Sequence, residues 1–357
     1  MKILILLLIP FILSGCYDYN QLNDLAIISG IAIDYENDEF QVTFEVISTK
    51  KEGESSGSNS TYYITSTGDS IVYAFTSAAN KVDKVPYFEH VEIVLFSDKV
   101  ASDYLEECID YLIRTERLRN EFYAAISVGN AEYLLSATTK ERPIVSSYLV
   151  DLLEFNNETY NSAYYTPFTK TVNSILSDGE DAMMPVFKVV DEDKIELSGL
   201  GVFKDFNLVH TFNVDEASVI NLLNNFKVES IHFNKTCGDK NIVIAVYQSD
   251  VSIEPGKDKI EVTAKMSARI SENNCDYDLK KAETYEELEK EFSKVIEKEM
   301  EQVLRQFQIY ESNALNIGRS YYNKYRDKDF YAWIYDDIEY DINLKINKKG
   351  LTFEVEQ

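Results

Sequence analysis

The sequence predicts an α/β fold of the α+β type, in which mixed, largely antiparallel sheets and packed helices form two or three domains. The 357 residues are 45% hydrophobic and 13% aromatic, which is enough apolar material for more than one core. Strand-like alternation and helix-like spacing of apolar residues both occur along the chain. Short polar turns separate several of the strand patterns, which is typical of antiparallel hairpins.

The N-terminus has the pattern of a cleaved signal peptide over residues 1–15. Lys2 precedes an apolar run from Ile3 to Leu13, which is too short for a membrane-spanning helix of about 20 apolar residues. Small residues before Cys16 suit a peptidase that cuts between Gly15 and Cys16. The alternative is an ordinary secretory signal in which Cys16 is incidental.

The segment that ends this leader, Leu-Ser-Gly-Cys, resembles the lipobox of bacterial lipoproteins. The resemblance implies that the sulfur of Cys16 carries a diacylglyceryl group and that the freed amino group can be acylated. Two acyl chains anchor a protein firmly, whereas one chain anchors it only marginally. We therefore expect membrane lipid to hold the chain at an extracytoplasmic face through Cys16.

Composition limits the classes of partner. The net charge is −26, and a surface of this sign repels nucleic-acid phosphates and anionic lipid headgroups. The sequence therefore predicts no nucleic-acid binding and disfavours polybasic membrane binding. Partners with basic faces and cationic small molecules are favoured.

The four cysteines permit no complete disulfide framework once Cys16 is lipidated, because three remain. A bridge between Cys237 and Cys275 is one interpretation, since disulfides persist outside the cytosol. The other is that Cys108, Cys237 and Cys275 are small buried hydrophobes.

The first predicted domain covers residues 16–200 and can contain two subdomains. It opens with a hairpin over residues 26–48 that turns at Glu36–Glu39. Strand and helix patterns then alternate, which indicates a mixed α/β layer. The further elements expected are a strand at 62–65, a helix at 70–80, strands at 91–97 and 122–128, a helix at 101–112, a helical piece at 148–155, and strands at 186–190 and 196–203. Residues 156–185 show little periodicity and read as a surface excursion or an unresolved helix.

The second predicted domain covers residues 201–357. A helix is expected at 214–226, strands at 242–247 and 260–270, and a closing strand at 338–346 with one buried face. The helix at 284–309 carries an apolar stripe that includes Leu288, Phe292 and Ile296. Packing of this stripe on its own sheet is favoured over a coiled-coil contact with a partner.

No motif for catalysis, metal or cofactor binding occurs in the chain. Phosphate loops, Cys-x-x-Cys and nucleophile elbows are absent, and the three histidines have no ligand spacing. Asp34, Glu45 and the pair Glu106-Glu107 could in principle supply carboxylates. With 61 acidic residues, we interpret them as chance neighbours on solvated faces. The sequence therefore predicts no enzyme and no cofactor.

Several segments resemble the Ger(x)C family of spore germination lipoproteins in the order in which they occur. The matching segments are Cys16-Tyr17-Asp18, Asn23–Asp34, Val91–Ser97, Leu112–Arg119, Leu197–Lys204 and Ala314–Arg319. Tyr17 stands where tryptophan is common, and Gly201 where alanine is usual. Asn313 and Asn316 stand where aspartate and glycine are more usual, so the family's turn geometry is not carried over.

The resemblance implies the C subunit of a nutrient germinant receptor in an endospore-forming bacterium. Such a subunit is non-enzymatic, is required for nutrient-triggered germination and has an α/β fold with mixed sheets. It lies on the outer face of the spore inner membrane beside a membrane-embedded A subunit and a transporter-like B subunit. The resemblance supplies no catalytic residue, no nutrient and no answer to whether this subunit contacts the nutrient.

Two other classes of protein are alternatives to this interpretation. A solute-binding lipoprotein of an importer would have two doubly wound lobes, which the hairpins of the C-terminal half do not suggest. An anchored hydrolase is disfavoured by the missing motifs. The basic cluster Arg114, Arg117 and Arg119 is either a face for a partner subunit or part of an intramolecular salt-bridge network.

Overall fold

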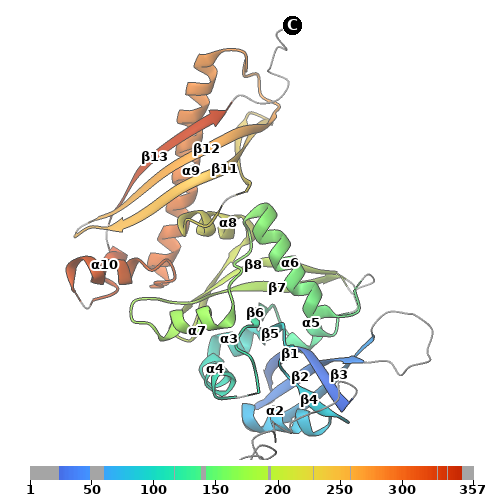
Figure 1. Cartoon of the computed structure of the whole chain (residues 1–357). Coiled ribbons are helices and arrows are strands. Elements are labelled where there is room, and N and C mark those ends of the chain that lie inside the picture. The colour runs from blue at the N-terminus through green and yellow to red at the C-terminus, as the bar shows by residue number, and fades with distance from the viewer. Residues whose placement is uncertain are drawn as a thin grey trace, which may run out of the picture.

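Two β-sheets joined through one shared core form the protein (Figure 1). The computed structural model describes residues 24–48, 60–115, 117–137, 142–191, 194–227, 229–257, 259–327, 329–335 and 337–347. Gly15 and Cys16 lie outside these residues.

The first sheet is nine-stranded and mixed. Its order is β3-β2-β1-β5-β6-β7-β8-β9, and β4 pairs with β1. The strands are β1 (Leu25–Glu36), β2 (Glu39–Ser48), β3 (Ser60–Gly68), β4 (Val85–Tyr87), β5 (Ile93–Ser97), β6 (Tyr123–Ser127), β7 (Met183–Asp191), β8 (Lys194–Lys204) and β9 (Asn207–Asn213). The central strands β1, β5, β6 and β7 run parallel, and hairpins extend the sheet at both sides.

Helices cover both faces of the first sheet, as a largely parallel centre requires. One face carries α2 (Ile71–Asn80), α3 (Asp98–Asp103), α4 (Leu105–Arg114) and α7 (Phe168–Leu176). The other face carries α5 (Ala131–Leu135) and α6 (Val145–Tyr160). Because the strands of the centre are apolar on both faces, each helix layer buries its own core.

The second sheet has the order β10-β11-β12-β13. Its strands are β10 (Ile231–Cys237), β11 (Lys240–Pro255), β12 (Lys259–Asn273) and β13 (Asp337–Asn347). The long helix α9 (Ala282–Ile309) lies along one face (Figure 1), and its buried stripe packs on alternating residues of β12 such as Val262 and Ala264. The packing of this stripe on its own sheet is confirmed.

The helix α8 (Val214–Leu223) lies between the two sheets (Figure 1). The helix α10 (Ile317–Tyr325) lies by one end of the second sheet, and the 3-10 turn η2 (Ala332–Tyr335) follows it in the chain. The core that contains α8 and α9 also includes Leu200, Val202 and Phe212 of the first sheet. Hydrophobic burial therefore couples the two sheets.

The predicted fold class is confirmed: sheets are mixed and helices pack on them. Residues 156–185, which lacked a readable period, contain the end of α6, all of α7 and the start of β7. Positions 200 and 201 both lie inside β8, a strand of the first sheet. In the described part of the chain, no helix is long and apolar enough to cross a membrane.

Candidate functional site

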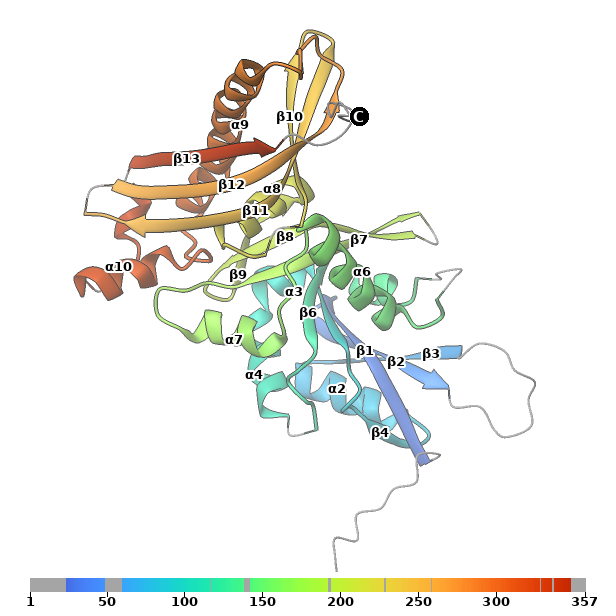
Figure 2. The same cartoon turned by 45° about the horizontal axis from the view of Figure 1, so that its top comes forward.

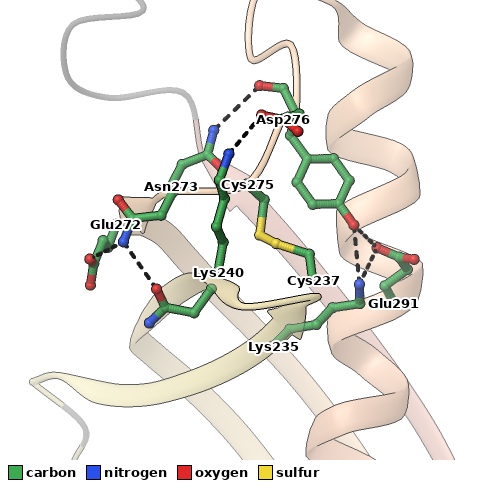
Figure 3. The surroundings of a disulfide bond; sticks show 11 residues. Lys235, Cys237, Lys240, Glu272, Asn273, Cys275, Asp276 and Glu291 are labelled. Atoms are coloured by element: carbon green, nitrogen blue, oxygen red, sulfur yellow. Dashed lines mark hydrogen bonds and ion pairs between the residues drawn. A yellow bond between two sulfur atoms is a disulfide. The ribbon is translucent and has the colours of Figure 1, made fainter.

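The disulfide between Cys237 and Cys275 joins the end of β10 to the segment between β12 and α9 (Figure 3). The Cα atoms of the two residues are 6.1 Å apart, within the normal range for a bridge. Because the edge strand β10 begins the sheet and α9 covers it, this bond closes the corner where strand, loop and helix meet.

Polar contacts reinforce this corner (Figure 3). The Tyr277 hydroxyl donates to the Glu291 carboxylate of α9 at 2.8 Å, and the Lys235 ammonium of β10 lies 3.3 Å from the same carboxylate. Lys235 also donates to the Tyr277 hydroxyl at 3.1 Å. The three side chains therefore tie β10 to α9 beside the disulfide.

Cys108, the remaining cysteine of the described chain, is fully buried in α4. Burial raises the pKa of its thiol far above the ordinary value. A thiol that stays protonated is a poor nucleophile, so Cys108 acts as a small core residue.

Glu45 of β2 is fully buried, and our interpretation of it as a solvated acid is wrong. Its carboxylate accepts the backbone N–H groups of Val145 and Ser146 at 2.7 and 3.0 Å, and the Ser29 hydroxyl donates to it at 2.9 Å. These N–H groups belong to the first turn of α6, where no intrahelical acceptor exists. Glu45 therefore fixes the start of α6 to the sheet.

Asp34 of β1 plays the same part for α5, and it is also buried rather than solvated. It accepts the N–H groups of Ala131 and Glu132 at 2.7 and 2.9 Å. Burial raises the pKa of Asp34 from 3.8 to about 6, against the lowering effect of these two hydrogen bonds. By contrast, Glu106 and Glu107 are exposed on α4, as predicted.

A buried joint connects the loop before β7 to the segment after α9. Asp181 accepts the N–H groups of Asp205 at 2.9 Å and Asn313 at 2.6 Å. The amide oxygen of Asn313 in turn accepts the indole N–H of Trp333 at 2.7 Å and the N–H of Gly318 at 3.1 Å. Burial raises the pKa of Asp181 above its ordinary value.

The backbone conformation and close packing of this joint explain why asparagine occupies position 316 and glycine position 318. Asn316 has φ 59° and ψ 22°, in the left-handed region that glycine and asparagine adopt most easily. A Cβ on Gly318 would lie 2.2 Å from the Phe330 carbonyl oxygen. Sequence resemblance pointed to the segment 314–319, but the buried partners Asp181 and Trp333 carried no signal in the sequence.

The interactions described for the basic cluster involve Arg114. Arg114 pairs with Asp110 one turn earlier on α4, at 2.8 Å. Arg117 and Arg119 are exposed on the loop before β6. Among the ion pairs described for this cluster, the salt-bridge interpretation therefore applies to Arg114.

The described ranges show no cluster of metal-ligating side chains. They contain no group of three or more His, Cys, Asp or Glu side chains able to hold an ion. His210 stacks on Tyr310 with ring centroids 4.4 Å apart, while His232 lines a cavity of about 260 Å³ with Asp215 and Glu299. His90, the third histidine, lies against Tyr87.

The fold is shared with a solved structure, the "Crystal Structure of the GerBC protein". The TM-score is 0.54 at 17% identity, over 93% of this chain and 100% of that one. Two family models match in tandem: "Spore germination protein N-terminal domain" over residues 18–189, and "Spore germination B3/ GerAC like, C-terminal" over residues 198–350. The chain belongs to this family of spore germination proteins.

Curated relatives match over nearly the full length. Spore germination protein B3 of Bacillus subtilis is 23% identical, with 95% of each chain covered. Spore germination protein KC of the same organism is 24% identical, over 98% of this chain and 93% of the relative. Spore germination protein GerQC of Bacillus cereus is 24% identical over 98% and 99%.

Proposed function

We propose that the chain is the lipid-anchored, non-enzymatic C subunit of a spore nutrient germinant receptor. Cys16 holds it on the extracytoplasmic face of the spore inner membrane, beside the A and B subunits. The observation that carries the proposal is the tandem match of both germination family models, which begins at residue 18, two residues after the lipobox-like cysteine.

The physical role proposed is that of a tethered assembly protein. Every buried carboxylate described above accepts hydrogen bonds from backbone N–H groups, which is the arrangement of a structural acid. The exposed surface is available for partner subunits, and the negative net charge favours basic faces on them.

Deletion of the gene tests the receptor role. In a strain without paralogues, deletion should abolish or strongly slow germination with at least one nutrient, while germination by a treatment that bypasses receptors stays normal. Unchanged responses to all nutrients would refute the proposal. Complementation with the intact gene is the control.

Replacement of the lipid site tests the anchor. The Cys16→Ala chain should move from the membrane fraction of spores to the soluble fraction, because it lacks the acyl chains. The Cys108→Ala chain is the matched control and should stay with the membrane. Retention of the Cys16→Ala chain, or an intact mass without lipid at Cys16 in the native protein, would contradict the anchor.

A further inference from the structure

The structure places the start of β1, the point nearest to Cys16 in the described chain, at the end of the molecule opposite the second sheet (Figure 2). Residues between Cys16 and Leu25 can span at most about 30 Å when fully extended. If Cys16 is in the membrane, as the proposed function holds, this end of the first sheet lies within reach of the lipid headgroups.

At this end of the first sheet, several parallel strands begin side by side. Leu25 of β1 pairs with Val85 of β4, and β5 and β6 begin on the same side because both run parallel to β1. The loops that precede these strands therefore gather there. We call this surface the tether edge; it consists of Asp24–Ala26, Ile47, Tyr62, Lys81–Glu92 and Arg117–Glu121.

The tether edge differs in charge from the rest of the protein. Lys81 and Lys84 line a groove of about 470 Å³ together with Leu25 and Tyr62. Arg117 and Arg119 are exposed on the loop that precedes β6. Five acids oppose these four bases, and they are Asp24, Asp83, Glu89, Glu92 and Glu121. The edge thus carries a net charge of only −1 (four bases against five acids) on a chain of net charge −26, so an anionic surface meets less repulsion here than the overall charge suggests.

Apolar groups accompany the bases on this edge. Val85 is 49% exposed and Tyr62 is 38% exposed. Tyrosine suits a membrane interface because its ring is apolar and its hydroxyl is polar. Lysine side chains can lie along such apolar surface and still present their ammonium groups to phosphate.

We propose that the tether edge is a membrane-facing surface on which Lys81, Lys84, Arg117 and Arg119 bind anionic phospholipid headgroups. The inference rests on the proposed lipid anchor and adds an orientation to it: the first sheet stands on the membrane and the second sheet projects away. The overall charge argued against membrane contact, but the local distribution favours it at this edge.

Footprinting of the tethered mature chain tests the orientation. Cys108 is buried and Cys237 and Cys275 form a disulfide, so Cys16 of the unlipidated chain can be coupled selectively to a maleimide lipid in vesicles. Acetylation of lysines is then followed by mass spectrometry. On vesicles with one third phosphatidylglycerol, Lys81 and Lys84 should react several-fold more slowly than on pure phosphatidylcholine. Equal rates on the two vesicles would overturn the proposal.

Lys294 and Lys298 on the exposed side of α9 serve as internal controls and should react equally on both vesicles. If the controls slow as much as Lys81 and Lys84, the orientation is wrong. If the native chain carries lipid at Cys16 and the control lysines still slow as much as Lys81 and Lys84, the lipid anchor stands. Only the proposed role of the tether edge is then refuted.

A binding measurement adds a second readout. The starting chain is untethered Cys16→Ala, and the test variant also has Lys81, Lys84, Arg117 and Arg119 changed to Gln. The test variant should bind the phosphatidylglycerol vesicles at least tenfold more weakly than the starting chain, because each base near an anionic surface contributes up to about fivefold to the binding constant. The matched variant changes Lys265, Arg269, Lys294 and Lys298 to Gln, with the same net charge. Equal affinities of the two variants would overturn the proposal.

Discussion

Glu45, Asp34 and Asp181 are carboxylates that the fold buries to satisfy backbone N–H groups at places where secondary structure begins or segments meet. The first N–H groups of a helix have no partner within it, so an acid on the neighbouring strand can replace water there. Each acid joins residues far apart in sequence: Glu45 and Asp34 fix the starts of α6 and α5 to the sheet, and Asp181 ties the β8–β9 turn to the segment after α9.

Removal of the Glu45 carboxylate should destabilise the first domain. Glu45→Ala leaves the N–H groups of Val145 and Ser146 buried without an acceptor, which costs about 3 kcal/mol or more of unfolding free energy. Urea denaturation measures the loss. Glu297→Ala, an exposed position on α9, should change stability by less than about 0.5 kcal/mol. Similar effects of the two changes would contradict the role assigned to Glu45.

Asp34 should make stability fall as pH rises. The unfolded carboxyl loses its proton near pH 3.8 and the folded one near pH 6. Between these values the folded state holds more protons, so stability from this group is full below the lower value and declines through the upper one, by about 3 kcal/mol in all. The melting temperature of Asp34→Asn, compared with the native protein from pH 4 to pH 7, checks this. Parallel pH profiles would refute it.

At the scale of elements, the second sheet depends on a corner that is closed covalently. Edge strands and their loops are the parts of a sheet that open most easily, because they have partners on one side only. The Cys237–Cys275 bond and the contacts of Glu291 hold β10 and the loop before α9 together.

The double variant Cys237→Ser, Cys275→Ser should therefore be less stable than the native chain. A disulfide that spans 38 residues stabilises a fold by about 2–4 kcal/mol, chiefly by limiting the unfolded chain. Thermal unfolding with and without reductant measures the effect. Reductant should lower the melting temperature of the native chain and leave the double variant unchanged. A native mass that does not change on reduction would show that the bond is absent.

At the scale of the whole molecule, the two sheets share one core and a polar joint, so they should unfold together. Gly318→Ala places a Cβ against the Phe330 carbonyl oxygen and the Asn313 side chain. Because the joint holds the Asn313 side chain in place, the change should cost more than about 2 kcal/mol. It should also separate the single calorimetric transition that we expect of the native chain into two. Gly129→Ala is the control. It has φ 77° and open space around it, so it should cost only about 1 kcal/mol. If Gly318→Ala still unfolds in one transition at the melting temperature of the native chain, the proposed coupling of the two sheets through the joint is contradicted.

Sequence patterns with a strong period predicted their elements well. The hairpin expected at 26–48 is β1 and β2, and the helix expected at 284–309 is α9, which begins two residues earlier. The helix expected at 70–80 is α2, which Ser70 caps by accepting the Tyr73 N–H at 3.4 Å. Within residues 156–185, the end of α6 is polar and gave no such signal. Helix α7 does bury Phe168, Val172 and Ile175 at helical spacing, but it is only nine residues long, so its pattern went unrecognised.

The sequence by itself determined the fold class, the alternation of strands and helices, and the family resemblance, because these depend on local spacing and on the order of motifs. Only the tertiary structure decided that Asp34 and Glu45 are buried acids, that Asp181 meets Asn313, and which charged residues gather at the tether edge. Their partners lie tens of residues or more away in the chain, and no local pattern records which distant N–H group or strand end a side chain will meet once the sheets are assembled.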